Sequence, residues 1–147
     1  MITTALTVDG RVIALAHYAG RAVLESVLAR YGMAFQEMVT LRLVAVADAP
    51  VEREDLVGQV VDALKVDGAD VHGVVEELLA KGLVATEATR LRVTGAGREL
   101  YDLASAETGE ISARIYTGIP VEDLATTGRV LTLVTGRANT ELAALTK

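Results

Sequence analysis

Four polar side chains in the first third of the chain could together bind a small anionic molecule. His17, Tyr18 and Arg21 lie within about one turn of an expected helix, and Arg42 lies in the expected helix that follows. They offer positive charge and several hydrogen-bond donors. A pocket lined by such groups would suit an anionic or phenolic ligand.

The same side chains have a second interpretation, as part of an interface between subunits. Glu25 or Glu37 could neutralise the arginines in a network of ion pairs, and polar rims of this kind are common at interfaces. Tyr101, further along the chain, could reach the pocket with its hydroxyl. A tyrosine at an interface more often buries its ring and satisfies the hydroxyl with one hydrogen bond. Both interpretations stay open.

Other reactive patterns in the sequence are incomplete. His72 and Glu76 are one helical turn apart, but two ligands are too few for a metal site, so we expect neither a metal nor another cofactor. Adjacent acids such as Glu122 and Asp123 point in different directions on a helix and share no substrate. Gly95-Ala96-Gly97 lacks the remaining spacing of a phosphate loop and is better explained as a helix start. We predict no catalytic residue, and an enzyme is the less favoured class.

The composition indicates one compact domain. The chain has 147 residues, of which 51% are hydrophobic and 3% aromatic, so its core must be built from Ala, Val and Leu. Cysteine is absent, which suits a reducing compartment, and we expect a cytoplasmic protein. Charged residues interrupt every apolar run, so no membrane span is expected. The formal charge of −6 opposes a general attraction to nucleic acid.

The apolar spacing predicts a mainly α-helical fold with one small β-hairpin. Apolar residues recur every three or four positions, and turn signals separate the segments. The expected helices are 10–31, 34–47, a third after Pro50, a fourth over about 71–81, a fifth from a Thr94 cap to Tyr116, and a last one from Val121. Leu83-Val84 and Leu91 to Val93 are expected to form the hairpin. The acids Glu52, Glu54 and Asp55 are expected in the first turn of the third helix.

Two sequence motifs, together with this order of elements, resemble the MarR (multiple antibiotic resistance regulator) family. Residues 71–84 read VHGVVEELLAKGLV, which is similar to the recognition helix of that family and the start of its wing. Residues 91–97 read LRVTGAG, which is similar to the exit from the wing. The tail from Gly118 to Leu131 resembles the closing pair of helices. The resemblance covers nearly the whole chain.

This resemblance implies a winged helix-turn-helix lobe at about 35–97 and dimerisation helices at about 1–34 and 98–147. Two copies would form a homodimer, with the recognition helix in the major groove of DNA and the wing at the minor groove. A small molecule bound between the dimer helices and the lobe would shift the spacing of the two recognition helices. The implied DNA contacts are Asp70, His72, Gly73 and Lys81 on the recognition helix and Arg90 and Arg92 on the wing.

The charge of this lobe leads to a second functional hypothesis. Nine acidic residues and five basic ones lie between Glu52 and Arg92, whereas DNA binding normally uses Lys and Arg contacts to phosphates. The first hypothesis is a ligand-responsive, DNA-binding transcription regulator. The alternative is a winged-helix protein that has lost DNA binding and acts as a small-molecule-binding protein or an enzyme through the dimer-helix cavity.

Overall fold

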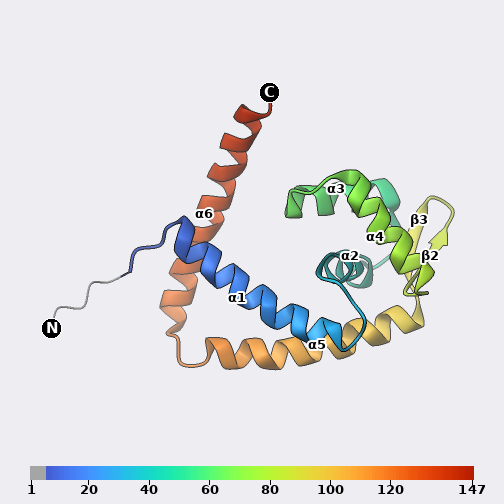
Figure 1. Cartoon of the computed structure of the whole chain (residues 1–147), viewed down its shortest axis with the longest axis horizontal. Helices are drawn as coiled ribbons and strands as arrows, with labels where there is room; N and C mark the ends of the chain where they lie inside the picture. Colours follow the sequence, from blue (N-terminus) through green and yellow to red (C-terminus); the bar gives the residue numbers. More distant parts are fainter. Residues whose placement is uncertain (1–5) are drawn as a thin grey trace. The chain divides into compact units, whose positions relative to one another are not determined.

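The computed structural model describes residues 6–147, whose contacts divide the chain into two compact units, one up to Gly109 and one from Glu110 to Lys147 (Figure 1). Six helices and three short strands make up these residues. In chain order they are α1 (Gly10–Ala29), α2 (Phe35–Ala45), β1 (Val51–Glu52), α3 (Arg53–Leu64), α4 (Gly68–Ala80), β2 (Val84–Glu87), β3 (Arg90–Val93), α5 (Gly95–Tyr116) and α6 (Val121–Leu145). All six expected helices and the hairpin are confirmed.

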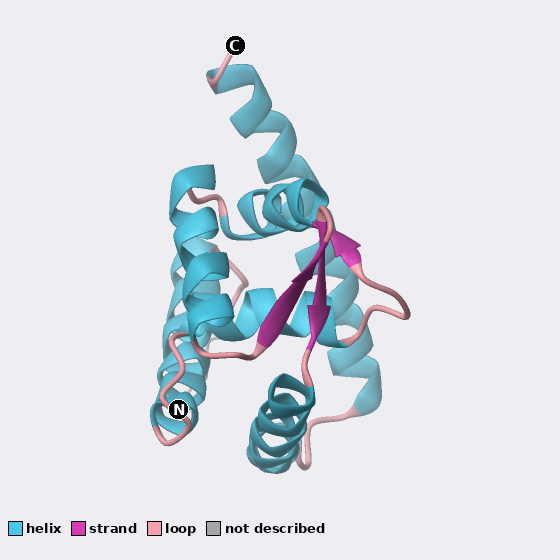
Figure 2. Cartoon of the chain, turned by 90° about the vertical axis from the view of Figure 1, so that its right-hand side faces the viewer, coloured by secondary structure: helices cyan, strands magenta, loops and turns pink. Residues whose placement is uncertain are grey.

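The sheet contains one strand that the sequence analysis assigned to a helix (Figure 2). The strand order is β1-β3-β2 and both pairings are antiparallel, with Glu52 opposite Arg90 and Thr86 opposite Leu91. Placing Glu52 in the first turn of α3 was therefore wrong, because its backbone is extended and pairs with β3. Glu54 and Asp55 do lie in that first turn, as predicted.

One fully buried leucine from each of five elements forms the centre of the core in the first unit. Most of the remaining core is Val, as the low aromatic content required. The five are Leu28 of α1, Leu41 of α2, Leu56 of α3, Leu78 of α4 and Leu91 of β3.

The exit from the wing is fixed by a threonine and a glycine. The Thr94 hydroxyl donates to the Gly82 carbonyl at 2.7 Å and accepts from the Gly97 backbone N–H at 3.0 Å, so it caps α5 as predicted. A Cβ at Gly97 would overlap the carbonyl oxygen of Leu83. The second glycine of Gly95-Ala96-Gly97 is therefore needed because the first turn of α5 approaches the start of the wing so closely.

Helix α1 begins at a side-chain cap and is strongly apolar. Asp9 accepts a hydrogen bond from the Val12 backbone N–H at 2.9 Å. Among the described residues, α1 is the one helix long and apolar enough to cross a membrane by length and composition, with a mean hydropathy of 1.3 over its best window, of which 11% is buried. These two measures alone do not establish a membrane span, and the expectation of none is not overturned by them. Helices that pack against protein meet them as well.

The second unit consists of the end of α5 and the whole of α6. Helix α6 follows Gly118, which has a φ of +82°, and Pro120, so the predicted break is present. None of its 25 residues is buried within the single chain.

Candidate functional site

A pocket in the first unit lies where α1, α2 and α4 meet. We call it the α1–α2–α4 pocket, and its volume is about 490 Å³. Its wall consists of Arg21, Glu25 and Ala29 from α1, Met33 and Ala34 from the connecting turn, Phe35, Gln36 and Glu37 from α2, and Val74 from α4. The pocket is thus bounded both by the long first helix and by the expected recognition helix.

Arg21 is the positive group of this pocket. Its Nε donates to Glu25 at 2.8 Å, and its guanidinium carbon lies 4.2 Å from the centroid of the Phe35 ring. The ring supports the guanidinium in a stacked position and leaves the edge with the Nη donors for another acceptor. Both members of the Arg21–Glu25 pair are about half exposed, so a carboxylate from solution could exchange with Glu25 at little cost.

Glu37 is a buried acid in the wall of the same pocket. One carboxylate oxygen accepts from the Ala34 backbone N–H at 2.8 Å, and the other accepts from Lys81 Nζ at 2.7 Å. Lys81 also donates to the Gly32 carbonyl at 2.8 Å. Because Lys81 directly follows α4, this ion pair links the end of that helix to the pocket.

The predicted ligand residues separate into groups in the structure. Arg21 lines the pocket, and its ion pair with Glu25 was one of the two interpretations left open. His17 and Tyr18 form a tilted ring pair with centroids 6.0 Å apart, and Tyr18 is 65% exposed. Arg42 is exposed, and Tyr101 packs half-buried against the core. None of these four lines this pocket.

Sequence reasoning missed Phe35, Glu37 and Val74 as pocket residues. Phe35 is the single Phe of the chain, and its place directly after the turn at Gly32 is a signal that could have been used. Glu37 and Val74 carried no such signal.

The expected DNA-binding face of α4 is acidic, and some of its side chains form hydrogen bonds within the lobe. Asp70 and Gly73 are exposed. His72 is half-buried, and its Nδ1 accepts from Arg53 Nε at 3.3 Å. The other end of the Arg53 guanidinium donates to Glu76 at 2.9 Å.

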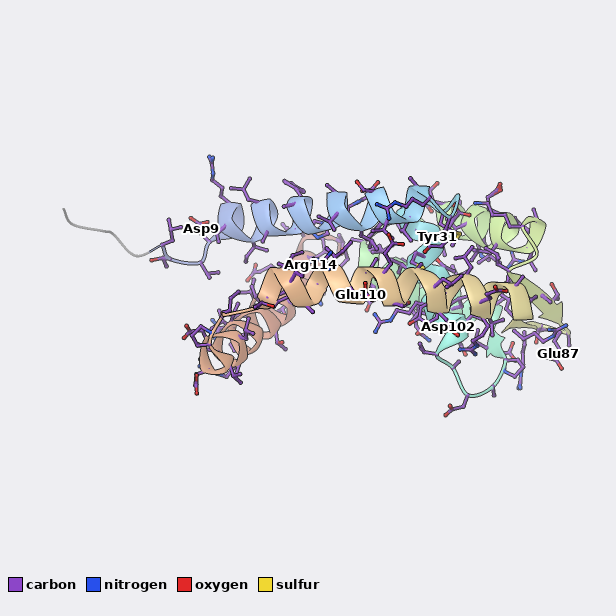
Figure 3. The ribbon with its side chains drawn as sticks, turned by 90° about the horizontal axis from the view of Figure 1, so that it is seen from below. Asp9, Tyr31, Glu87, Asp102, Glu110 and Arg114 are labelled. Carbon is purple, nitrogen blue, oxygen red and sulfur yellow. The ribbon has the colours of Figure 1, made fainter. Side chains whose placement is uncertain are left out.

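Arg90, one of the two arginines of the wing, forms a similar ion pair. Glu52 of β1 accepts from Arg90 Nε and from the Thr89 hydroxyl, each at 2.8 Å. The hydrogen bond from Arg90 and then that from Thr89 hold the pKa of the Glu52 carboxyl below its usual value, and Glu52 in turn raises the pKa of Arg90. Glu87, labelled in Figure 3, lies on the same hairpin.

Four of the five basic residues between Glu52 and Arg92 form ion pairs within the chain. The pairs are Arg53–Glu76, Lys65–Asp62, Lys81–Glu37 and Arg90–Glu52. Within residues 6–147, only Arg92 of these five has no such pair. The lobe therefore presents few unneutralised cations for a phosphate backbone.

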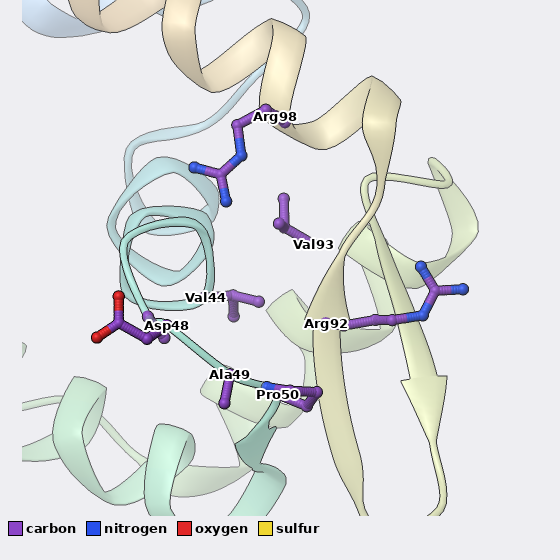
Figure 4. A pocket seen from close by; sticks show the side chains of 8 residues that line it. Val44, Asp48, Ala49, Pro50, Arg92, Val93 and Arg98 are labelled. Carbon is purple, nitrogen blue, oxygen red and sulfur yellow. The ribbon is translucent and has the colours of Figure 1, made fainter.

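Two further features of the first unit lie outside these sites. A pocket of about 250 Å³ lies beside the loop after α2, with Asp48, Pro50, Val93 and Arg98 in its wall (Figure 4). Just after α1, Tyr31 (labelled in Figure 3) donates to Glu107 of α5 at 2.9 Å, and Arg30 pairs with the same carboxylate. The hydrogen bond to Glu107 raises the pKa of the Tyr31 phenol above 10. No group of three potential metal ligands occurs within residues 6–147.

Chains of known structure share this fold. CouR from Rhodococcus jostii RHA1, bound to p-coumaroyl-CoA, gives a TM-score of 0.74 at 22% identity over 90% of this chain and 96% of that one. A MarR-family transcriptional regulator from Rhodococcus sp. RHA1 gives 0.73 at 21% identity, over 86% and 92% of the two chains. A MarR-family protein from Mycobacterium tuberculosis in complex with p-aminosalicylic acid gives 0.67 at 19% identity, over 87% and 98%.

The sequence itself matches no protein-family model and no curated protein. The chain nevertheless has the winged-helix fold of MarR-family regulators, as the sequence resemblance predicted.

Proposed function

We propose that this protein is a ligand-responsive transcription regulator that binds DNA as a homodimer in the cytoplasm. The observation that carries this proposal is the α1–α2–α4 pocket, whose wall joins the first helix to the recognition helix. A molecule bound there contacts both elements at once. It can therefore bias the position of α4 relative to the helix that we expect to hold the dimer together.

The chemistry of the pocket favours an anionic aromatic ligand. Apolar walls from Met33, Phe35 and Val74 would cover a ring, and Arg21 would donate hydrogen bonds to the anionic end in place of Glu25. Two proteins of the same fold are bound to p-coumaroyl-CoA and p-aminosalicylic acid. His17, Tyr18, Arg42 and Tyr101 stay predicted as further contacts.

Exposed apolar side chains on α1 and α6 support the homodimer. Leu15 of α1 is 54% exposed, and Leu133 and Val134 of α6 are more than 40% exposed. Arg21 and Glu25 make α1 amphipathic, which favours a protein surface over a lipid one as its cover. A second copy would bury these residues.

DNA would be contacted by α4 and the wing. Asp70, His72 and Gly73 lie on α4, and Arg90 and Arg92 lie on β3, where the resemblance places the base and minor-groove contacts. Lys81 would contribute mainly through the position of α4, since Glu37 and Gly32 hold its ammonium group.

The test measures binding of the protein to a labelled duplex from upstream of its own coding sequence, at low salt, with salicylate or p-coumarate added. We expect the wild type to bind and the phenolic carboxylate to weaken binding. Arg21→Gln should keep DNA binding and lose the ligand response, whereas Arg11→Gln at the exposed start of α1 should keep both. Arg42→Gln decides whether the site extends to that residue. Ligand binding without any DNA binding would reject the regulator and support the small-molecule-binding alternative.

A further inference from the structure

The tip of the wing holds two hydrogen-bond donors on one carboxylate. We infer that Thr89 and Arg90 form a phosphodiester-binding site for the DNA backbone, which Glu52 of the same chain occupies until DNA replaces it. This inference rests on the proposed function, because the ligand is duplex DNA. Glu52 would then act as an internal competitor of DNA.

The donor geometry is that of an oxyanion site. Thr89 donates its hydroxyl to one carboxylate oxygen of Glu52 and Arg90 donates Nε to the other, each at 2.8 Å. A phosphodiester also presents two unesterified oxygens that share a negative charge. Arg side chains, hydroxyls and backbone N–H groups are the usual donors to it.

The wing keeps these donors in place without the Glu52 carboxylate. Backbone pairing sets Glu52 opposite Arg90, and the Arg53 backbone N–H donates to the Thr89 carbonyl at 3.2 Å. Replacing Glu52 by Gln therefore removes the negative charge that holds Arg90 and leaves the strand pairing intact.

The site is open to solvent and to a partner. The Arg90 side chain is 55% exposed and that of Glu52 is 40% exposed, so a phosphate can approach the donors. An exposed ion pair of this kind contributes little to stability, and its exchange for another oxyanion is therefore readily reversed.

The consequence for binding concerns both affinity and its salt dependence. While Glu52 holds Arg90, one phosphate contact is missing or is made only after the ion pair breaks. Releasing Arg90 should steepen the slope of log K against log salt by up to about 1, because each phosphate contact contributes about 0.9 and the wild type makes this contact only in those complexes in which DNA has displaced Glu52.

The experiment compares Glu52→Gln with Glu87→Gln, a matched change of charge on the same hairpin. Glu87 makes no ion pair and no side-chain hydrogen bond within the described residues. Fluorescence anisotropy with the upstream duplex, from about 50 to 200 mM salt, measures affinity and slope. We expect an affinity gain of about tenfold and a steeper slope for Glu52→Gln, against about threefold or less and no change in slope for Glu87→Gln. Equal effects of the two variants would overturn the inference.

A double-variant test isolates Arg90. Arg90→Gln should cost little affinity in the wild type and most of the gain in the Glu52→Gln background. An equal loss in both backgrounds would show that Glu52 does not restrain Arg90.

Inorganic phosphate separates this inference from the proposed function. In Glu52→Gln, the Arg90 Nε–H signal in a ¹⁵N NMR titration should shift with phosphate, and in the wild type it should shift much less. A shift without DNA binding would keep the oxyanion site and reject the regulator. No shift in Glu52→Gln would reject the site even if the protein binds DNA.

Discussion

The first unit and helix α6 differ in how they treat their apolar side chains. Each of five elements in the first unit buries a leucine completely within the chain, whereas α6 buries none of its residues. The first unit therefore holds its fold through its own contacts. We expect a second copy of the chain to cover the exposed apolar side chains of α6.

The polar groups of α6 point to the same conclusion. The hydroxyls of Thr127, Thr132, Thr135 and Thr140 each donate to the backbone carbonyl four residues earlier. These threonines are thus satisfied within the helix and require no polar partner from the surface that covers it. An apolar partner surface would therefore leave these four hydroxyls satisfied.

The largest effect is expected from Gly97→Ala in the lobe. The new Cβ would overlap the Leu83 carbonyl, and neither backbone can move without disturbing the wing, so unfolding should become easier by about 3 kcal/mol. Gly95→Ala, whose Cβ would have no neighbour within 4 Å, is the control and should change stability by less than about 1 kcal/mol. Urea unfolding measures both, and similar values would show that the close approach is not required.

A smaller loss is expected from Lys81→Met. This change leaves the buried Glu37 carboxylate without its cation and should cost about 2 kcal/mol, less than a fully buried pair because Lys81 is partly exposed. The exposed Lys65–Asp62 pair provides the comparison, and Lys65→Met should cost about 0.5 kcal/mol or less. Thermal unfolding distinguishes the two, and equal losses would remove Glu37 as a structural link to the pocket.

A charge introduced on helix α6 should act only by weakening the dimer. Leu133→Glu places a carboxylate on an apolar surface that we expect a second copy to cover, and it should weaken the dimer by about 1.5 kcal/mol, roughly tenfold in Kd. Thr126→Glu on the same helix is the control. Analytical ultracentrifugation over a range of concentrations measures the dimer. An unchanged Kd for Leu133→Glu would exclude that residue from the interface.

The smallest effect is expected on the stability of the lobe when the pH is lowered. Because the Glu52 pKa is lowered from 4.5 in the folded chain, its ion pair stabilises the lobe above that pH and the stabilisation is lost as pH falls through the lowered value. Urea midpoints between about pH 7 and pH 3 should fall slightly less for Glu52→Gln than for the wild type. A steeper fall for the variant would contradict the lowered pKa.

The sequence predicted the helices well because each follows from local spacing and caps. The Thr94 cap and the end of α4 before Lys81 and Gly82 are set by residues within one or two turns. Strand β1 was missed because two residues are too few to show the apolar–polar alternation of a strand. They are defined as a strand only by their pairing with β3, which is distant in the chain.

The pocket could be predicted only in part for the same reason. Arg21 was predicted because His17 and Tyr18 lie beside it on the same helix, and the three side chains together indicated a ligand-binding site. Glu37 looks like a surface acid in the first turn of α2, and its burial depends on Lys81, 44 positions later. The predicted ligand role of Arg42 and Tyr101 stays a prediction.

The shared wall of the α1–α2–α4 pocket also sets how sensitive the protein would be to its ligand. If ligand and DNA act on one another through Val74 and the Lys81 ion pair, each must change the binding constant of the other by the same factor. Under the proposed function, a dimer on its operator therefore responds only at a higher ligand concentration than a free dimer does. The number of operators in the cell would thus help to set the threshold of induction.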